Sequence, residues 1–328
     1  MKKLFIALAL LLAVNYCFAA DVKNLIPTAE KIVSDSLKNS DNRIKANAIE
    51  VASSTGQVQF TQKIVELLND PAVLVRFASA LAIGDLQYKA GEKNLRKFLN
   101  DPDLNVRIAA AYALYKFGNK QYLSMIQASA KQDDQTVRAN VAMLLGKLKS
   151  TESLPVLYGI KDDPNSNDAS AFGATEAIAR IGDEKVYPKI WAMLISVYAD
   201  DRYMGTRAMG AFGGTKGTEA LLTMLEDEVL EVRLSAAELL GSLGDPSGAM
   251  VVLEYLTNID QKDKNIGQKD EKRVIDMRNA IAALAIGQIG DAKLIECLPK
   301  LLKSDSPAVR LAASKSVFIL AAKSPKLP

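Results

Sequence analysis

Aspartate and arginine recur together along this chain at a nearly fixed separation. Three pairs lie six residues apart, namely Asp70 with Arg76, Asp101 with Arg107, and Asp227 with Arg233. Two more arginines follow an aspartate by five residues, Arg138 after Asp133 and Arg310 after Asp305. Carboxylate and guanidinium groups form strong charge-assisted hydrogen bonds, so such pairs either bind a polar ligand or stabilise the fold. Because the spacing is regular in segments that otherwise differ, we interpret the pairs as structural contacts.

Histidine and the common catalytic motifs are absent from the sequence. The chain contains no histidine, which excludes Ser-His-Asp and Cys-His nucleophile systems and any imidazole metal ligand. No GxSxG, GxGxxG or phosphate-loop pattern occurs. The nearest glycine-rich stretch is GAFGGTKGT, Gly210 to Thr218, but its Lys216 precedes a glycine instead of following one, so an inter-helix turn is the favoured interpretation. We therefore expect a protein without catalytic activity and without a cofactor.

One polar segment has part of the pattern of a calcium loop. KDDPNSND, Lys161 to Asp168, alternates the oxygen-bearing side chains of Asp163, Asn165 and Asn167. It lacks the central glycine, and Ala174 stands where a bidentate glutamate would complete the site. Helix capping explains these residues more simply, so we expect no metal site here.

The arginines mark an internal repeat. DPAVLVRFASALAIG contains Arg76, DPDLNVRIAAAYALY contains Arg107, and VRANVAMLLGKL contains Arg138. These three marks are evenly spaced, and similar segments place further marks at Lys45, Ala171, Gly205, Arg233, Asn279 and Arg310. Nine copies with a period of this length are typical of a solenoid built from one repeated pair of helices.

Each copy predicts two helices. In the fourth copy, Val137, Val141 and Leu144 follow helical spacing along one face. This second helix is expected to begin after a turn such as Asp70-Pro71 and to end near a recurring glycine. The first helix is the stretch before the turn, such as TQKIVELLN. One hairpin cannot bury both faces of its helices, so neighbouring copies must stack to complete the core.

The repeated segments resemble HEAT repeats, and more closely the short bacterial form of the phycobilisome-lyase type. The likeness rests on DPAVLVRFASALAIG, DPDLNVRIAAAYAL, VRANVAMLLGKL, VRLSAAELLGSLGD and VRLAASKSVFIL, and it covers the chain from about Val22 to Lys323. It implies an all-α, right-handed solenoid of about nine two-helix repeats, with residues 21–328 in a single domain. It also implies a ladder in which each arginine pairs with turn carboxylates of its own or the next repeat, interrupted at the copies marked by Ala171, Gly205 and Asn279.

Two groups of enzymes share this repeat architecture. Deoxyhypusine hydroxylases are HEAT-like di-iron enzymes that need His-Glu pairs, which a chain without histidine cannot supply. Phycobilin lyases of this repeat class attach a pigment in the cytoplasm, whereas the N-terminus of this chain predicts export. Both observations disfavour an enzyme. A repeat protein that is enzyme-associated, lyase-like or oxidoreductase-like is kept as the alternative to a scaffold, because one fold can have many functions.

Residues 1–20 have the pattern of a secretory signal peptide. The charged start Met1 to Lys3 precedes a short apolar run and several small residues. The run is too short to span a bilayer. Lipid attachment at Cys17 is disfavoured because Tyr16 precedes it, where lipoprotein signals carry a small residue. We expect cleavage after Ala19 or Ala20 and a mature protein that is periplasmic or secreted.

Charge and cysteine content limit the classes of partner. Removal of Lys2 and Lys3 leaves 39 basic and 38 acidic side chains, a net formal charge of +1. Such a chain has no overall field that attracts nucleic acid or anionic lipid. Cys297 is the single cysteine left after cleavage, and its apolar sequence neighbours predict a buried helical residue. We expect no nucleic-acid partner and no membrane span.

Two features are candidates for partner binding. The first is a set of apolar residues at positions one, five and eight after the marks of the second to fourth copies: Phe77, Leu81, Ile108, Tyr112, Tyr115 and Met143. In other copies position five carries Glu50, Glu176, Glu238 or Lys315, which indicates a surface that faces water. The apolar residues either line a concave groove for a peptide or helix, or fill the core between repeats.

The second candidate is a polar insertion. TNIDQKDKNIGQKDEKR, Thr257 to Arg273, makes the interval between the marks Arg233 and Asn279 half as long again as the intervals between the first marks. It is either a loop that contacts a partner or a solvated linker. Together these observations predict an exported, non-catalytic scaffold that binds a protein or peptide on its concave surface.

Overall fold

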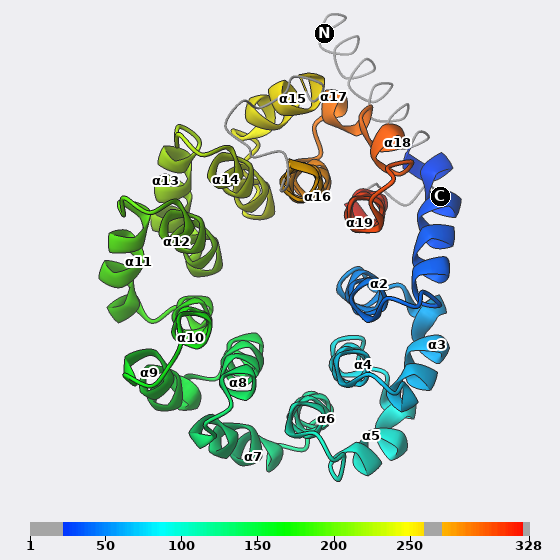
Figure 1. Cartoon of the computed structure of the whole chain (residues 1–328), viewed down its shortest axis with the longest axis vertical. Coiled ribbons are helices and arrows are strands. Elements are labelled where there is room, and N and C mark those ends of the chain that lie inside the picture. Colours follow the sequence, from blue (N-terminus) through cyan, green and yellow to red (C-terminus); the bar gives the residue numbers. More distant parts are fainter. Residues whose placement is uncertain (1–21, 259–270, 324–328) are drawn as a thin grey trace, which may run out of the picture.

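The computed structural model describes residues 22–258 and 271–323. Every regular element in these two ranges is an α-helix or a 3-10 helix, and the elements are arranged as a solenoid (Figure 1). The prediction of an all-α solenoid is therefore confirmed. None of the helices in the described ranges is both long enough and apolar enough to cross a bilayer.

The inner layer of the solenoid contains the second helix of each repeat (Figure 1). These nine helices are α2 (Asn42–Ser54), α4 (Val73–Asp85), α6 (Leu104–Lys116), α8 (Gln135–Leu148), α10 (Asp168–Ile181), α12 (Ala199–Phe212), α14 (Leu230–Ser242), α16 (Glu271–Ile289) and α19 (Pro307–Lys323). Each of the nine sequence marks lies on one of these helices, so the period in the sequence is the period of the inner layer.

The outer layer contains the other α-helices, most of them shorter than the inner ones. They are the helix over residues 22–36, α3 (Thr61–Glu66), α5 (Glu92–Phe98), α7 (Tyr122–Ala128), α9 (Leu154–Asp162), α11 (Tyr187–Leu194), α13 (Gly214–Met224), α15 (Ala249–Thr257), α17 (Ala292–Ile295) and α18 (Leu298–Leu301). The predicted insertion falls between α15 and α16. Its residues 259–270 lie outside the described residues, while Thr257 still belongs to α15 and Arg273 to α16.

The solenoid closes into a ring. Each inner helix contacts the next, and the last, α19, contacts the first, α2 (Figure 1). At this seam the Lys315 Nζ lies 2.7 Å from the Glu50 Oε1. Buried residues of the two end repeats, such as Ile49 and Val309, belong to one apolar cluster. The concave surface expected from the sequence is therefore the inner wall of a closed ring.

Aspartates orient the turns from which the inner helices begin. The Asp101 Oδ1 accepts a hydrogen bond from the Asp103 N–H at 2.9 Å, and Asp103 in turn caps α6 through the N–H of Asn105. Pro102 lies in the turn before the capping residue and so outside the helix. The proline thus shapes the turn, and a separate residue satisfies the free N–H groups of the helix.

Glycine near the end of an inner helix allows a close approach to the next one. A Cβ atom on Gly146 of α8 would lie 2.8 Å from the Cα of Ala177 on α10, and one on Gly287 of α16 would lie 2.6 Å from the Cα of Ser316 on α19. These helices pack backbone to backbone through small residues. The recurring glycines therefore set the spacing of the inner layer.

Candidate functional site

A ladder of ion pairs joins consecutive repeats at the edge of the ring where the inner helices begin. A basic residue of one inner helix pairs with an aspartate in the turn of the next repeat, at a constant separation in sequence. The pairs are Lys45 with Asp70 (2.6 Å), Arg76 with Asp101 (2.9 Å), Arg138 with Asp163 (2.6 Å) and Arg202 with Asp227 (2.7 Å). Most of these side chains are largely buried, so the ladder connects repeats internally.

Each pair forms one rung of the ladder, and in two rungs the arginine, Arg76 or Arg202, also fixes the turn of its own repeat. The Arg76 Nη1 donates to the backbone oxygens of Asp70 and Pro71 at 3.1 and 3.0 Å. Its Nε and Nη2 donate to the two carboxylate oxygens of Asp101 at 2.9 and 3.0 Å. One guanidinium group therefore uses three nitrogens to position two successive turns, which a point-like ammonium group cannot do.

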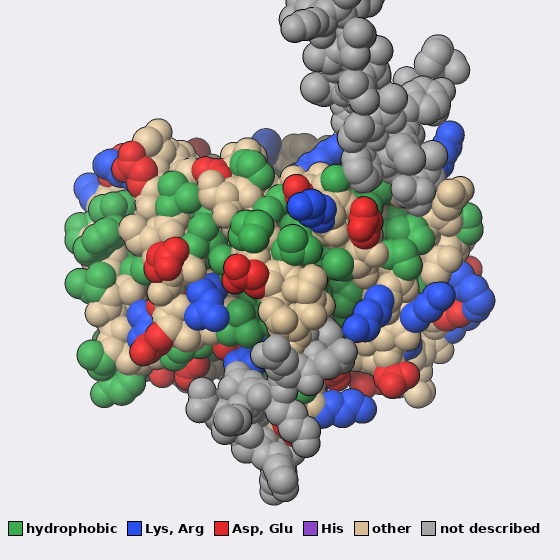
Figure 2. Space-filling model, turned by 90° about the horizontal axis from the view of Figure 1, so that it is seen from above, with side chains coloured by type: hydrophobic (Ala, Val, Ile, Leu, Met, Phe, Trp, Pro, Cys, Tyr) green, Lys and Arg blue, Asp and Glu red, His purple; other side chains and the backbone are tan. Residues whose placement is uncertain are grey.

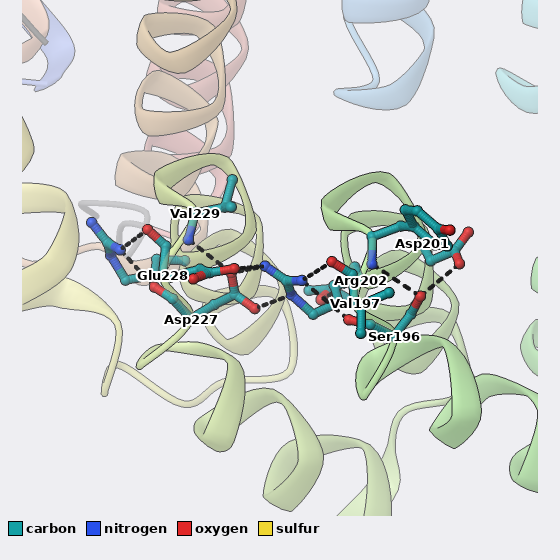
Figure 3. A network of polar contacts seen from close by, with 10 residues as sticks. Ser196, Val197, Asp201, Arg202, Asp227, Glu228 and Val229 are labelled. Atoms are coloured by element: carbon teal, nitrogen blue, oxygen red, sulfur yellow. Dashed lines mark hydrogen bonds and ion pairs between the residues drawn. The ribbon is translucent and has the colours of Figure 1, made fainter. Parts of the chain in front are cut away.

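In the sixth repeat the ladder residue is Arg202, not a residue at the predicted mark Gly205. The Arg202 Nε and Nη2 donate to Asp227 at 2.7 and 3.1 Å, and its Nη1 donates to the backbone oxygens of Ser196 and Val197 (Figure 3). The expected interruption at this copy is wrong. The glycine pattern places the mark three residues too late, whereas the step from Arg202 to Arg233 equals the regular step between the first marks.

Other departures from the ladder follow the sequence more closely, including Arg107, for which Gln132 stands in place of the aspartate. Between the fifth and sixth repeats, Ala171 stands in place of the basic residue and Ser196 in place of the aspartate, so neither partner is left without the other. In the eighth repeat, the Arg278 Nε lies 2.8 Å from the Glu231 Oε1 of the preceding inner helix. This contact runs backward instead of forward along the ring.

The residues expected to line a concave groove do not form one. Phe77, Ile108 and Tyr112 are buried, Leu81 and Tyr115 are half-buried, and Met143 is 37% exposed. Five of them belong to the apolar clusters between inner helices or pack against these clusters. The groove prediction is therefore corrected, because these side chains fill the space between neighbouring repeats.

Tyr112 has a polar contact at the end of its ring. Its hydroxyl donates to the Asp85 Oδ1 at 2.6 Å, and the Asp85 Oδ2 lies 2.9 Å from the Lys147 Nζ. Burial, followed by the nearby Asp85 charge, raises the pKa of Tyr112 far above its ordinary value, so the hydroxyl stays protonated and donates. The three side chains come from α4, α6 and α8 and stabilise their packing.

The weaker sequence candidates for chemistry have structural contacts. Lys216 of the glycine-rich stretch lies in α13 and pairs with Glu184. In the calcium-like segment, Asp163 pairs with Arg138, and the Asn167 side chain caps α10. A hydrogen bond from the Asn165 N–H and the contact with Arg138 lower the pKa of Asp163. Residues 22–258 and 271–323 contain no group of three or more His, Cys, Asp or Glu side chains placed to hold a metal ion.

The turn between α11 and α12 is exposed and apolar. Ile195, Val197 and Tyr198 are 66%, 84% and 70% exposed, and Trp191, one helical turn before Ile195, is 40% exposed. At the equivalent places the third repeat has Asn100, Pro102 and Asp103. Exposed apolar groups that gather in one place are uncommon outside interaction surfaces. This turn is therefore the strongest candidate for a binding surface.

Hydrogen bonds hold the apolar turn in a fixed shape. The Arg202 Nη1 lies 3.1 Å from the Ser196 oxygen and 3.3 Å from the Val197 oxygen (Figure 3). The Ser196 hydroxyl donates to Asp201 at 2.8 Å and accepts from the Tyr198 N–H at 3.2 Å. A surface that already has its binding conformation loses little conformational entropy when a partner docks.

Carboxylates flank the apolar turn. Asp200 follows it and is exposed, and the side chain of Glu228, which contacts Arg202 at 3.0 Å, is 80% exposed. Arg202 itself is buried under the turn and is already paired. The surface that a partner meets thus combines apolar side chains with negative charge. By contrast, acidic and basic side chains are interspersed on the face of the ring in Figure 2.

Two family models match the chain by sequence. A model of HEAT repeats matches residues 61–137, and a model of the single HEAT repeat matches residues 218–245. The chain therefore contains HEAT repeats. The matched segments contain α4 and α6 in one part of the ring and α14 in another, and the inner helices between them have the same arrangement.

No curated protein sequence matches this HEAT-repeat protein. Among solved structures, human deoxyhypusine hydroxylase in complex with glycerol is 17% identical, with 83% of this chain and 99% of that chain covered and a TM-score of 0.40. The complex of CpcE and CpcF of phycocyanin lyase from Nostoc sp. PCC7120 is 19% identical, with 78% and 93% covered and a TM-score of 0.44. Likenesses at these values carry no argument about this chain, so its function is argued from its own residues.

The sequence of the HEAT-repeat protein contains a signal for the apolar turn. Aligned on Arg202, the residues six to four positions earlier are Ser196, Val197 and Tyr198, where Arg107 has Asp101, Pro102 and Asp103. An alignment of the sixth repeat on Arg202 therefore shows that its turn differs from that of the third repeat. An alignment on Gly205 is shifted by three residues, so the apolar residues no longer align with the turn.

Proposed function

We propose that this HEAT-repeat protein is a non-catalytic scaffold that binds a protein partner at the turn between α11 and α12. The observation that carries the proposal is the joint exposure of Ile195, Val197 and Tyr198 in one turn, where the third repeat has Asn100, Pro102 and Asp103. Burial of apolar area is the main favourable term in protein association, so this turn is where a partner gains most. The absence of histidine from the sequence supports a role without catalysis.

The charges around the turn indicate the chemistry of the partner. Asp200 and Glu228 favour basic residues beside the apolar ones, because complementary charges raise the association rate and exclude acidic competitors. The proposed partner segment therefore presents apolar side chains next to lysine or arginine. It docks on the rim of the ring, not on the inner wall.

The docking proposal is tested with a photoreactive residue at position 198 or, as a control, at position 58. Val58 is also exposed, at 70%, but it lies in a turn of the first repeat. In cell-envelope extract, a defined protein should crosslink to position 198 and not to position 58. The double variant V197S/Y198S should abolish its capture, whereas V58S should leave it unchanged. Equal capture by all variants would contradict the proposal.

The place of action forms a second part of the proposal. The signal-peptide pattern of residues 1–20, which lie outside the described residues, supports a mature protein in the periplasm or outside the cell. N-terminal sequencing of the protein from a bacterial periplasmic fraction should begin at Ala20 or Asp21. Recovery of the intact N-terminus from the cytoplasm alone would reject export.

A further inference from the structure

Arg233 has the anchored geometry of a ladder arginine but holds no carboxylate. Its Nη1 donates to the backbone oxygens of Asp227 and Glu228 at 2.6 and 3.1 Å, as the Arg202 Nη1 does in the preceding turn. Within the described part of the chain, no acidic side chain pairs with its Nε and Nη2, the edge through which Arg202 binds Asp227. Asn258 stands at the position where the ladder would place an aspartate.

A cavity of about 670 Å³ lies where the missing carboxylate would be. Arg233 and Leu230 of α14, Tyr255 and Asn258 at the end of α15, and Ile275 of α16 are among the residues that line it. These are the elements that would enclose a rung between the seventh and eighth repeats. The cavity thus lies where Arg233 would pair with an aspartate if the ladder continued.

The guanidinium group is prepared for one kind of ligand. Two carbonyl contacts fix the Nη1, so the Nε and Nη2 are oriented before any ligand arrives. Two parallel N–H donors match the two oxygens of a carboxylate. Glu226, Asp227, Glu254 and Arg278 also line the cavity, with Asp227 paired to Arg202 and Arg278 paired to Glu231. The cavity therefore has no general positive field, and a carboxylate would be bound through the Nε and Nη2 of Arg233.

We infer that this cavity binds a carboxylate group of a peptide and that Arg233 is the residue that recognises it. The group is either an acidic side chain or a free C-terminus, which share this chemistry. The inference extends the proposed function, because the peptide would belong to the bound partner. It adds a polar anchor at Arg233, which contacts the backbone oxygen of Asp227, the residue whose carboxylate Arg202 binds from the side of the apolar turn.

The test measures how fast phenylglyoxal modifies individual arginines of the full chain, by mass spectrometry of its peptides. Three probes are compared: N-acetylglutamate α-amide with a side-chain carboxylate, N-acetylalanine with a terminal carboxylate, and neutral N-acetylglutamine amide. A carboxylate probe at twice its dissociation constant should slow modification of Arg233 about threefold. The more protective of the two acidic probes identifies the source of the carboxylate.

Arg107 is the matched control. It makes the same two carbonyl contacts, to Asp101 and Pro102, but does not line this cavity. Its modification rate should not change. Absence of protection at Arg233, equal protection of both arginines, or equal protection by the neutral probe would overturn the inference.

Substitution separates the charge of Arg233 from its geometry. R233K keeps the charge and loses the planar pair of donors, so binding of the protective probe, followed by calorimetry, should weaken about tenfold, whereas R107K should bind as wild type does. Unchanged binding by R233K with native helical circular dichroism would overturn the assignment. The V197S/Y198S variant should retain the protection of Arg233, so failure of the apolar turn and failure of this site remain distinguishable.

Discussion

Glu50 and Lys315 are 265 residues apart in the sequence, yet the Glu50 Oε1 lies 2.7 Å from the Lys315 Nζ. This contact joins the first inner helix to the last and closes the ring. The Glu50 side chain is 55% exposed, so the ion pair itself adds little stability. Closure therefore depends mainly on apolar residues at the seam, such as Leu311, which lines a cavity of about 190 Å³ between α2, α16 and α19.

An acidic residue in the seam should open the ring. Leu311 is 2% exposed, so L311D places a charge in an apolar contact and should cost several kcal/mol, about 3 or more. Small-angle X-ray scattering should show a larger maximum dimension while circular dichroism remains helical. K315Q, which removes only the ion pair, should cost under about 1 kcal/mol and keep the ring closed. An unchanged dimension for L311D would mean that the seam does not depend on this residue.

Loss of a buried ladder carboxylate should be far more costly than loss of a surface one. The Asp101 side chain is 5% exposed and holds Arg76, so D101A should lower the free energy of unfolding by about 3–5 kcal/mol through the uncompensated guanidinium group. Glu92 pairs with Arg96 on the surface, and E92A should cost at most about 1 kcal/mol. Urea unfolding measures both. Similar losses would contradict a structural role for the ladder.

The close approach of α8 and α10 should not tolerate a methyl group. G146A would place its Cβ 2.8 Å from the Ala177 backbone and should destabilise the protein by about 1–3 kcal/mol. Gly159 of α9 has open space around it, so G159A should be neutral or stabilise by about 0.5–1 kcal/mol because alanine favours the helix. Thermal unfolding of the two variants compares the sites. A neutral G146A would show that the two helices can separate at little cost.

Glu238 should make stability depend on pH. Burial raises the pKa of Glu238, against the opposing effect of the charges of Lys315 and Arg207. The folded protein then binds this proton more tightly than the unfolded chain, so the group destabilises the fold above its folded pKa, and this cost disappears as the pH falls toward the ordinary value of 4.5. From pH 7 to pH 5, wild type should gain stability relative to E238Q in urea unfolding. A difference between wild type and E238Q that stays constant with pH would show that Glu238 does not titrate differently in the folded protein.

The repeat itself could be derived from the sequence because its contacts are local. Arg76 and Asp101 lie in consecutive repeats, and glycines such as Gly146 recur one repeat after another, so both the hairpin and the spacing of the ladder leave a periodic trace. The register failed only at Arg202, where the turn residues that define a copy are replaced by Ser196 and Val197. Without the aspartate and proline of the turn, the sixth copy could not be aligned with the others from its sequence.

The sequence by itself thus determined an all-α chain of helical hairpins, the absence of histidine chemistry and the arginine marks that position each turn. The tertiary structure decided that the chain closes into a ring, that Tyr112 lies between repeats and not in a groove, and that Arg233 faces a cavity. The physical reason is that a periodic pattern encodes contacts between neighbouring repeats. Closure and side-chain burial depend on small rotations summed over the whole solenoid, which bring together residues such as Glu50 and Lys315 that share no local pattern.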